Sequence, residues 1–469
     1  MKRRTRIAVI VTVLGLGLVT SGCRDEAPTA ISELKPADLY GFPSAAAVQP
    51  PDTGLTAEVL LREIAADTWQ FFEAAVECQS NLPIDYLWID PDRVGANTSI
   101  TNIGLYLLAV LTAWDLNLID RGQTVELLQR TLATVDKLTT YRGFHYNWYN
   151  LETLEPAVKF ISTVDAGWFY SALSIVELVF PDEFGPLCRR LLAAVDFDWL
   201  YDAETGHFRH GFQVDTEEFS PYHYSMLASE ARIVSYLALA RGEVPISHWK
   251  ALYSTLPDSF EQQQVPEYVQ GIGYYRYKDL LIIPAWGGSL FEYLMPNLLM
   301  DERAQAPYGL GENNRRAIEV HIDYALNEMG YTAWGMSPST APEGNYGEFG
   351  VPLIGSRIAC YSPTIVSPHA ALLAINYMPE AVISNIKRLL ASYPIYGEFG
   401  FYDCVDPISG AVGRAYLTLD QAMIFLSLGN YLTDQVLPGR FRSLRGMDLV
   451  SDLVSKDNFF PKRNSPLKN

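Results

Sequence analysis

TNIGLYLLAVLTAWDLNLIDRGQTVELLQRTLATVDKL, residues 101–138, contains two helical patterns of different kinds. The first, TNIGLYLLAVLTAW, is apolar on nearly every side, which is typical of a buried helix. The second, TVELLQRTLATVDKL, is amphipathic and should therefore pack on one side only. The link NLIDRG between them is short. This stretch predicts a helical hairpin with one inner and one outer helix.

The same hairpin recurs along the chain, with buried and amphipathic helices in alternation. We expect helices over the ranges 56–79, 99–117, 122–138, 163–180, 184–197, 222–241, 245–255, 289–304, 311–329, 364–376, 378–392 and 418–432. Each outer helix is followed by a long connection, over 80–98, 139–162, 198–221, 256–288, 330–363 and 393–417. Loops longer than about 12–15 residues are uncommon in compact domains and are usually functional. The pattern predicts an all-α fold, an (α/α)6 toroid of six inner and six outer helices, with the long loops gathered at one end.

The N-terminal segment is typical of targeting and not of a fold. MKRRTR is basic, the following apolar run is short for a membrane span, and the phrase TSGC resembles a lipoprotein processing box. We therefore expect a signal peptide over 1–22, lipidation at Cys23 and a Pro/Ala-rich tether over 23–50. An uncleaved N-terminal anchor is the alternative. The body would then be a catalytic domain over 51–440 with a C-terminal tail over 441–469, facing the periplasm or cell exterior.

Charge and cysteine usage exclude several classes of function. A formal net charge of −19 disfavours nucleic-acid binding. No C-x-x-C pair occurs, which argues against a zinc or iron–sulfur site. Cys360 and Cys404 could form a disulfide in an extracytoplasmic compartment, or both could be buried free thiols. No oligomeric state follows from the sequence.

The long connections share an unusual composition of aromatic and polar residues. Examples are WIDPDR, GFHYNWYN, GHFRHGF, GYTAWGM and YGEFGFYD. Aromatic rings stack on sugar faces while polar groups bind hydroxyls, so these loops favour a carbohydrate site. The alternative is that many of these rings only attach the loops to the helices. No Gly-rich phosphate loop or H-E-x-x-H motif occurs.

Four carboxylates lie near the predicted starts of inner helices. They are Asp165, Glu230, Glu292 and Asp420. Glu292 follows Ser289 in S-x-x-E spacing, a capping-box signature, and a cap also accounts for Asp165. Glu230 has no such explanation, because it is predicted to lie inside its helix among apolar residues. A buried ion pair with an arginine is its alternative.

Glycosidic chemistry needs two carboxyl groups, one of which protonates the leaving oxygen. Glu230 fits the acid best, because burial raises the pKa of a carboxyl group. Glu292 and Asp420 compete for the role of nucleophile or base, and Asp165 could hold a sugar hydroxyl or the catalytic water. Scattered histidines are interpreted as hydrogen-bonding loop residues and not as metal ligands: His145, His207, His210, His223 and His369. We predict neither a metal nor a cofactor.

Several phrases resemble the transglycosylation domain of cyclic β-1,2-glucan synthases and the related β-1,2-glucanases and "glucoamylase-like" proteins. They include ISTVDAGW, HYSMLASEAR, WGGSLFEYLMP, GFYDCVDP and YLTLDQ, in order from about residue 60 to 432. The resemblance implies an (α/α)6 toroid acting on β-1,2-glucan. It implies that Glu230 is an acid or nucleophile, that Glu292 completes the pair in synthase-like members, and that Asp420 is the base in inverting members. Trp168, beside Asp165, departs from the family pattern and suggests a reshaped subsite.

The sequence therefore predicts a lipid-anchored glycoside hydrolase or transglycosylase that acts on a β-glucan oligo- or polysaccharide. A glycan-binding envelope lipoprotein without activity is the second hypothesis, and a polysaccharide lyase is a third, which the negative charge disfavours. Catalytic residues are predicted at Glu230, Glu292 and Asp420. Residues predicted to contact substrate are Asp165, Tyr146, Trp148, Trp168, Arg232, Trp286, Tyr293, Trp334, Glu343, Glu348, Tyr402 and Gln421.

Overall fold

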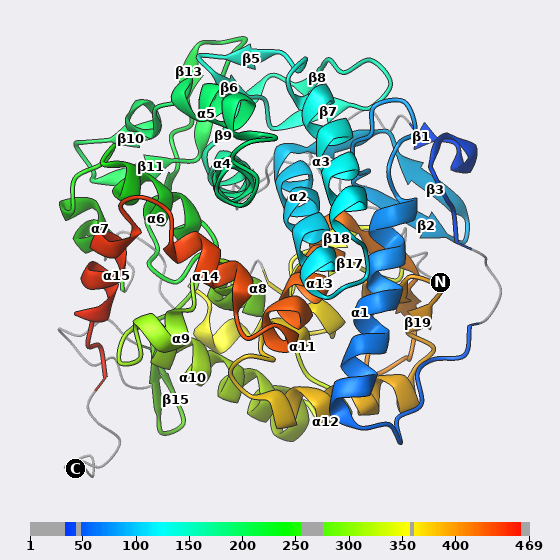
Figure 1. Ribbon diagram of the computed structural model, residues 1–469. Coiled ribbons are helices and arrows are strands. Elements are labelled where there is room, and N and C mark those ends of the chain that lie inside the picture. The colour runs from blue at the N-terminus through cyan, green and yellow to red at the C-terminus, as the bar shows by residue number, and fades with distance from the viewer. Residues whose placement is uncertain (1–32, 44–47, 255–274, 357–360, 461–469) are drawn as a thin grey trace, which may run out of the picture.

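Helices dominate the structure, a computed structural model that describes residues 33–43, 48–254, 275–356 and 361–460 (Figure 1). The predicted signal peptide, Cys23, half of the tether and Cys360 lie outside the described residues. The helices matching the predicted inner set are α2 (Ile100–Asp115), α4 (Thr163–Val179), α6 (Arg232–Arg241), α8 (Leu290–Leu294), α11 (Pro368–Leu373) and α13 (Thr418–Leu432). Those matching the outer set are α1 (Ala57–Ala74), α3 (Arg121–Val135), α5 (Gly185–Ala193), α7 (Ser247–Ala251), α10 (Leu310–Asp323) and α12 (Pro379–Ser392).

Most of the inner helices that follow one another in the chain pack together. Helix α2 packs against α4 and α13, α4 packs against α6, and α11 packs against α8 and α13. On their outer sides α1 contacts α13, α3 contacts α2, α5 contacts α4, α10 contacts α8 and α12 contacts α11. The contact of α1 with α13 brings the beginning and the end of the helical order together (Figure 1). Buried and amphipathic helices thus take the inner and outer places expected from their sequences.

Two glycines allow the inner helices to approach closely. A Cβ atom at Gly104 in α2 would lie 2.9 Å from the Phe169 Cα of α4. A Cβ atom at Gly167 in α4 would lie 2.8 Å from the Val234 Cβ of α6. Because a side chain at either position would collide with the neighbouring helix, glycine is required for this packing.

The long connections contain short strands, which the all-α prediction missed. The strands are β1 (Glu33–Leu34), β2 (Tyr86–Ile89), β3 (Asp92–Gly95), β4 (Asn97–Ser99), β5 (Thr140–Tyr141), β6 (Phe144–His145), β7 (Trp148–Asn150), β8 (Pro156–Val158), β9 (Phe160–Ser162), β10 (Tyr201–Asp202), β11 (His207–Arg209), β12 (Gly211–Gln213), β13 (Glu218–Phe219), β14 (His223–Tyr224), β15 (Tyr275–Tyr277), β16 (Leu280–Ile282), β17 (Ser339–Thr340), β18 (Tyr346–Gly347), β19 (Tyr396–Gly397), β20 (Gly400–Phe401), β21 (Cys404–Val405), β22 (Val412–Gly413) and β23 (Ala415–Leu417). The largest sheet among the described residues has the order β1-β3-β2-β23 and joins segments far apart in sequence. Strands of two to four residues are too short to show an alternating pattern.

The predicted helix 222–241 is wrong in its first half, because the helix begins at Arg232. Residues 223–224 form β14, which pairs with β11, and the following segment is irregular. The Ser229 hydroxyl accepts a hydrogen bond from the Ala231 amide at 3.2 Å, and such local bonds compete with helix formation. Glu230 therefore lies just before the helix and not inside it.

The predicted helix 289–304 is divided. After α8, residues 295–298 form a 3-10 turn and α9 (Glu302–Gln305) follows. Pro296 lacks an amide hydrogen and cannot continue the α-helical bonding pattern. Helices α14 (Val436–Arg442) and α15 (Met447–Ser455) complete the described chain and pack on α4 and α6. The domain boundaries stay predictions.

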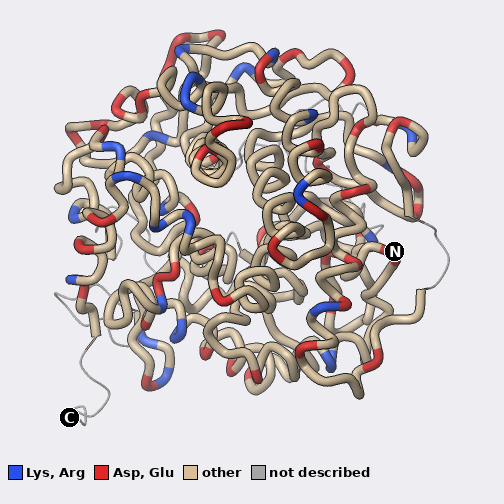
Figure 2. The backbone as a smooth tube through the Cα atoms, viewed as in Figure 1, with Lys and Arg blue, Asp and Glu red and all other residues tan. Residues whose placement is uncertain are grey.

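Acidic residues are distributed around the molecule and outnumber basic ones, with 54 Asp and Glu against 35 Lys and Arg (Figure 2). Among the described helices none is long and apolar enough to cross a membrane.

Candidate active site

Glu230 and Glu292 lie close enough for their charges to interact, and both stand at the beginnings of inner helices. Glu292 is the third residue of α8, and Glu230 lies two residues before α6. The negative charge of Glu230 contributes to the raised pKa of Glu292. The structure thus brings together the two glutamates that the sequence singled out.

Glu292 is held by donors from its own loop. Its Oε1 accepts from the Gly287 amide at 2.8 Å. Its Oε2 accepts from the Ser289 amide at 2.9 Å and from the Ser289 hydroxyl at 2.8 Å. The capping box predicted from S-x-x-E is confirmed. Burial raises the pKa of Glu292 to about 7, with a further contribution from Glu230, and these hydrogen bonds oppose the rise.

Glu230 is the more accessible member of the pair. Its residue is partly exposed, whereas Glu292 is 3% exposed. The Ser229 hydroxyl donates to Glu230 Oε2 at 3.1 Å. Desolvation raises the pKa of Glu230, hydrogen bonds and Arg232 oppose the rise, and the charge of Asp165 adds to it. Asp165 is therefore also close to the pair.

Arg232 fixes the backbone beside both glutamates. Its Nη1 donates to the Ser229 carbonyl at 2.8 Å and to the Glu292 carbonyl at 3.2 Å. Its Nε and Nη2 form a buried ion pair with Glu302, at 2.9 and 3.1 Å. Nη2 also donates to the Tyr293 carbonyl at 2.8 Å. The guanidinium is buried and its donors bind protein groups, which gives Arg232 a positioning role, and its predicted contact with substrate stays untested.

Asp165 lies in a polar pocket at the start of α4. The Thr101 hydroxyl donates to Oδ1 at 2.5 Å, and the Ser162 hydroxyl donates to Oδ2. When the side-chain amide of Asn147 is oriented with its nitrogen toward Asp165, this nitrogen donates to both carboxylate oxygens at 3.2 Å. The Asp165 amide in turn donates to the Ser162 hydroxyl, so the predicted cap is confirmed.

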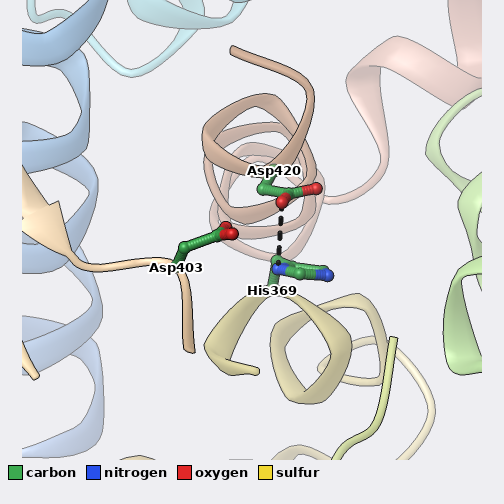
Figure 3. Close-up of side chains that lie close together, drawn as sticks. All are labelled: His369, Asp403 and Asp420. Carbon is green, nitrogen blue, oxygen red and sulfur yellow. Dashed lines mark ion pairs between the residues drawn. The ribbon is translucent and has the colours of Figure 1, made fainter. Parts of the chain in front are cut away.

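Asp420 belongs to a second acidic group. It is the third residue of α13 and lies beside Asp403, which follows β20, and His369 of α11 (Figure 3). Burial raises the pKa of Asp420 well above its usual range, and Asp403 and Asp85 add to the effect. Burial also raises the pKa of Asp85 to about 6. The strong perturbation of this group marks a candidate functional site.

Several residues predicted to contact substrate are instead buried in the core. Trp168 and Trp334 are 2% and 0% exposed. The Tyr293 hydroxyl is bound to the Ile283 and Ile354 carbonyls at 3.1 and 3.0 Å. Gln421 is 0% exposed and donates to the Phe401 carbonyl at 3.0 Å. These four side chains contact neighbouring helices and loops, and their predicted contacts with substrate stay predictions.

The remaining predicted contacts stay predictions. Tyr146 and Tyr402 are 7% and 4% exposed, and Arg414 donates to the Tyr402 hydroxyl at 3.3 Å. The residues with greater exposure are Trp148, Trp286, Glu343 and Glu348. Among the histidines, the rings of His145, His207 and His223 make the expected loop hydrogen bonds.

Sequence reasoning missed Tyr346, Asp403 and Asp85. Tyr346 is 52% exposed, and the charges of Asp420, Asp403 and Asp85 reach it. None of the three lies at the N-terminus of an inner helix, and the sequence prediction considered only carboxylates at those positions. Asp403 and Tyr346 stand in the phrases GFYDCVDP and YGEFG, and these aromatic–acidic phrases were the available signal.

A glutamine at position 292 should change how stability depends on pH. The folded chain retains one proton on the interacting pair of Glu292 and Glu230 up to about pH 7, whereas Glu292 of the unfolded chain releases its proton near 4.5. Wild-type stability should therefore fall as pH rises through this window, and Glu292→Gln should remove on the order of 3 kcal/mol of that fall. Denaturant unfolding at both ends of the window measures the difference. An unchanged pH dependence would contradict the raised pKa.

Comparisons with known proteins agree with these features. Residues 222–444 match the family model described as "Putative glucoamylase", and residues 63–182 match one described as a protein of unknown function (DUF3131). The resemblance to glucoamylase-like proteins is confirmed. The chain is also 25% identical, over 486 residues, to cyclic beta-(1,2)-glucan synthase NdvB of Rhizobium meliloti (strain 1021). The match covers 74% of this chain and 16% of the length of that relative.

Solved structures show which fold the chain shares. The endo-beta-1,2-glucanase of Chitinophaga pinensis, in complex with sophorotriose and glucose, is 18% identical with a TM-score of 0.70, covering 87% of this chain and 100% of that one. The beta-1,2-glucanase of Parabacteroides distasonis is 16% identical with a TM-score of 0.70, covering 86% and 60%.

Proposed function

We propose that this chain is a glycoside hydrolase or transglycosylase that acts on β-glucan, with β-1,2-linked glucan as the first substrate to test. One observation carries the proposal: Glu230 and Glu292, at the starts of neighbouring inner helices, form an interacting pair of carboxyl groups with raised pKa values. Such pairs are the chemical requirement for glycosidic bond cleavage. The names of the matched relatives support the choice of β-1,2-glucan.

In the proposed reaction Glu230 is the acid and Glu292 the nucleophile. Two interacting carboxyl groups lose their protons in separate steps, so the pair retains one proton over a range of pH. We assign that proton to Glu230, because Glu230 is the more accessible and because three hydrogen bonds stabilise the carboxylate of Glu292. Oε1 of Glu292 accepts one of these bonds, which leaves it a lone pair for attack on the anomeric carbon.

The proposed steps balance as follows. Glu230 gives its proton to the glycosidic oxygen while Glu292 bonds to the anomeric carbon, and the leaving glucan departs as an alcohol. Water or a glucan hydroxyl then attacks the same carbon, the ester bond to Glu292 breaks, and Glu230 takes up the attacking group's proton. Water gives hydrolysis, and a sugar hydroxyl gives transglycosylation. Asp420 as a base in an inverting reaction is the alternative assignment.

The wider setting also belongs to this proposal. We infer an (α/α)6 toroid from the alternation of helices, supported by the packing of consecutive inner helices. We further propose lipidation at Cys23 and a location at the cell envelope, supported by the basic and apolar N-terminal sequence.

A panel of glucans of different linkage tests the substrate class. The purified protein should release oligosaccharides from β-1,2-glucan and little from β-1,3-, β-1,4- or α-linked glucans. Activity on α-glucans alone would contradict the assignment. Tight binding of β-1,2-glucan without products would favour the glycan-binding alternative instead.

Tyr346 should contribute to substrate binding. Its exposed ring stands beside the second acidic group, and stacking on a sugar is worth about 0.5–1.5 kcal/mol in related aromatic contacts. Tyr346→Ala should therefore raise KM by about 3–10-fold, with a smaller change in kcat. Tyr308→Ala is the matched control, because Tyr308 is 57% exposed and its backbone carbonyl binds Phe459 in the C-terminal segment. Equal KM values for the two variants would contradict the role of Tyr346.

A further inference from the structure

Three side chains from separate elements converge beside α13. They are His369, the second residue of α11, Asp403 in the turn between β20 and β21, and Asp420 of α13 (Figure 3). One potential ligand atom from each lies within 4.8 Å of the others. Each residue is 1% exposed. The group is therefore closed off from bulk solvent.

The carboxylates of this group lack the hydrogen bonds that burial normally requires. Thr340 donates its backbone amide to Asp403 Oδ2. No hydrogen-bond donor of the described residues reaches Asp403 Oδ1 or either oxygen of Asp420. Across the same described ranges, no lysine or arginine forms an ion pair with either aspartate. Buried ionised carboxylates without donors or a counter-charge are strongly disfavoured, so either a proton or a cation must accompany this group.

His369 does not supply the missing positive charge. Its Nδ1 lies 3.8 Å from Asp420 Oδ2, which is longer than a hydrogen bond. In its neutral form the imidazole has one nitrogen lone pair available for a metal ion.

A shared proton and a bound metal cation would interact with different numbers of the oxygen and nitrogen atoms in this group. Asp403 and Asp420 lie within hydrogen-bonding reach of each other, so one carboxyl could carry a proton shared with the other. That proton would engage one oxygen of each residue and leave the second Asp420 oxygen and His369 Nε2 without hydrogen-bond partners. A cation placed among the three side chains would engage all of them.

We propose that His369, Asp403 and Asp420 bind a divalent cation of the first transition row, such as Zn²⁺ or Mn²⁺. One imidazole nitrogen with two carboxylates is a donor set that these ions accept. The Thr340 amide fixes Asp403 from behind, as outer-shell groups do for metal-binding carboxylates. The ion would join α11, α13 and the β20–β21 turn. This inference does not depend on glucan cleavage.

Metal analysis of the full chain tests the proposal directly. After dialysis against a chelator and then metal-free buffer, the protein is titrated with ZnCl₂ or MnCl₂, with CaCl₂ for comparison. We expect one tightly bound transition-metal ion per chain by elemental analysis. The Tm should rise by about 3–5 °C when the free metal concentration reaches about 100 times Kd.

Variants locate the ion and separate it from adventitious binding. Asp403→Asn and His369→Gln should lose the bound ion and the Tm rise. Asp406→Asn should keep both, because Asp406 lies in the same region but binds Ser409 instead. Wild-type protein that takes up neither metal would overturn the proposal even if a variant fails to fold. Retention of the ion by both ligand variants would also overturn the proposal. A third contradicting result is an infrared band of a protonated carboxyl group that is present in both metal-free and metal-treated wild type and is lost in Asp403→Asn.

Discussion

Glu230→Gln should reduce the rate of β-glucan cleavage by about 10²–10⁴-fold, which is the range that a general acid contributes. Glutamine keeps the size and hydrogen-bonding shape of the side chain but has no acidic proton to give. Because Glu230 is partly exposed beside the buried Glu292, the variant should still fold and bind glucan. The measurement is kcat and KM for oligosaccharide release, together with glucan affinity by calorimetry.

Glu218→Gln is the matched control, since Glu218 lies exposed on β13. It should leave both kinetic constants unchanged. If Glu230→Gln retains wild-type kcat, then Glu230 is not the acid. If kcat falls only in parallel with the loss of folded protein, the effect is structural and the assignment again fails.

Arg232→Met should lower the free energy of unfolding by about 3–5 kcal/mol, because it leaves the charge of Glu302 buried and unpaired. Glu302 is 0% exposed and also accepts hydrogen bonds from Tyr236 at 2.6 Å and Asn314 at 2.6 Å. These neutral donors do not replace the lost positive charge. Urea unfolding of both proteins gives the difference.

Lys278→Met is the control for the loss of a charge in an exposed ion pair. Lys278 pairs with Asp323 and Glu328 and is 51% exposed, so its removal should cost no more than about 1 kcal/mol. Arg232→Lys should not restore stability, because an ammonium group does not reproduce the planar donor fork. Similar costs for the Met variants at 232 and 278 would contradict the importance of the buried pair.

The order of the helices could be predicted because their patterns are long and their caps are local. Helix α13 begins and ends at the predicted residues, and α4 begins at the predicted Thr163 after the Ser162 cap. The toroidal arrangement was an inference from loop lengths. The short strands were not predictable, because pairs such as β2 with β23 depend on residues more than 300 positions apart.

The site was predictable where sequence-local features mark it. Glu292 was found from its cap and its place before an apolar helix, and both features are present. The segment before Arg232 was misjudged because its composition suits a helix, while Ser229 and Arg232 bind its backbone in another conformation. Trp168 looked like a subsite residue, but only the folded structure shows that its ring faces the core.

The second acidic group shows why the rest was missed. Asp403 reaches Asp420 and His369 only through tertiary packing of the β20–β21 turn against α11 and α13. No spacing in the sequence relates these three residues. The prediction that the protein uses neither a metal nor a cofactor relied on the absence of local sequence motifs. Residues that are this far apart in the sequence do not form such a motif.

The most direct test of the central claim is product formation from β-1,2-glucan by the wild type and by Glu230→Gln and Glu292→Gln at equal concentrations of folded protein. Chromatography of the products and calorimetric affinity are recorded on the same samples. We expect oligosaccharides from the wild type, about 10²-fold or greater loss of activity in both variants, and retained glucan binding in all three proteins. Binding without any products from the wild type, or full activity in either variant, would contradict it.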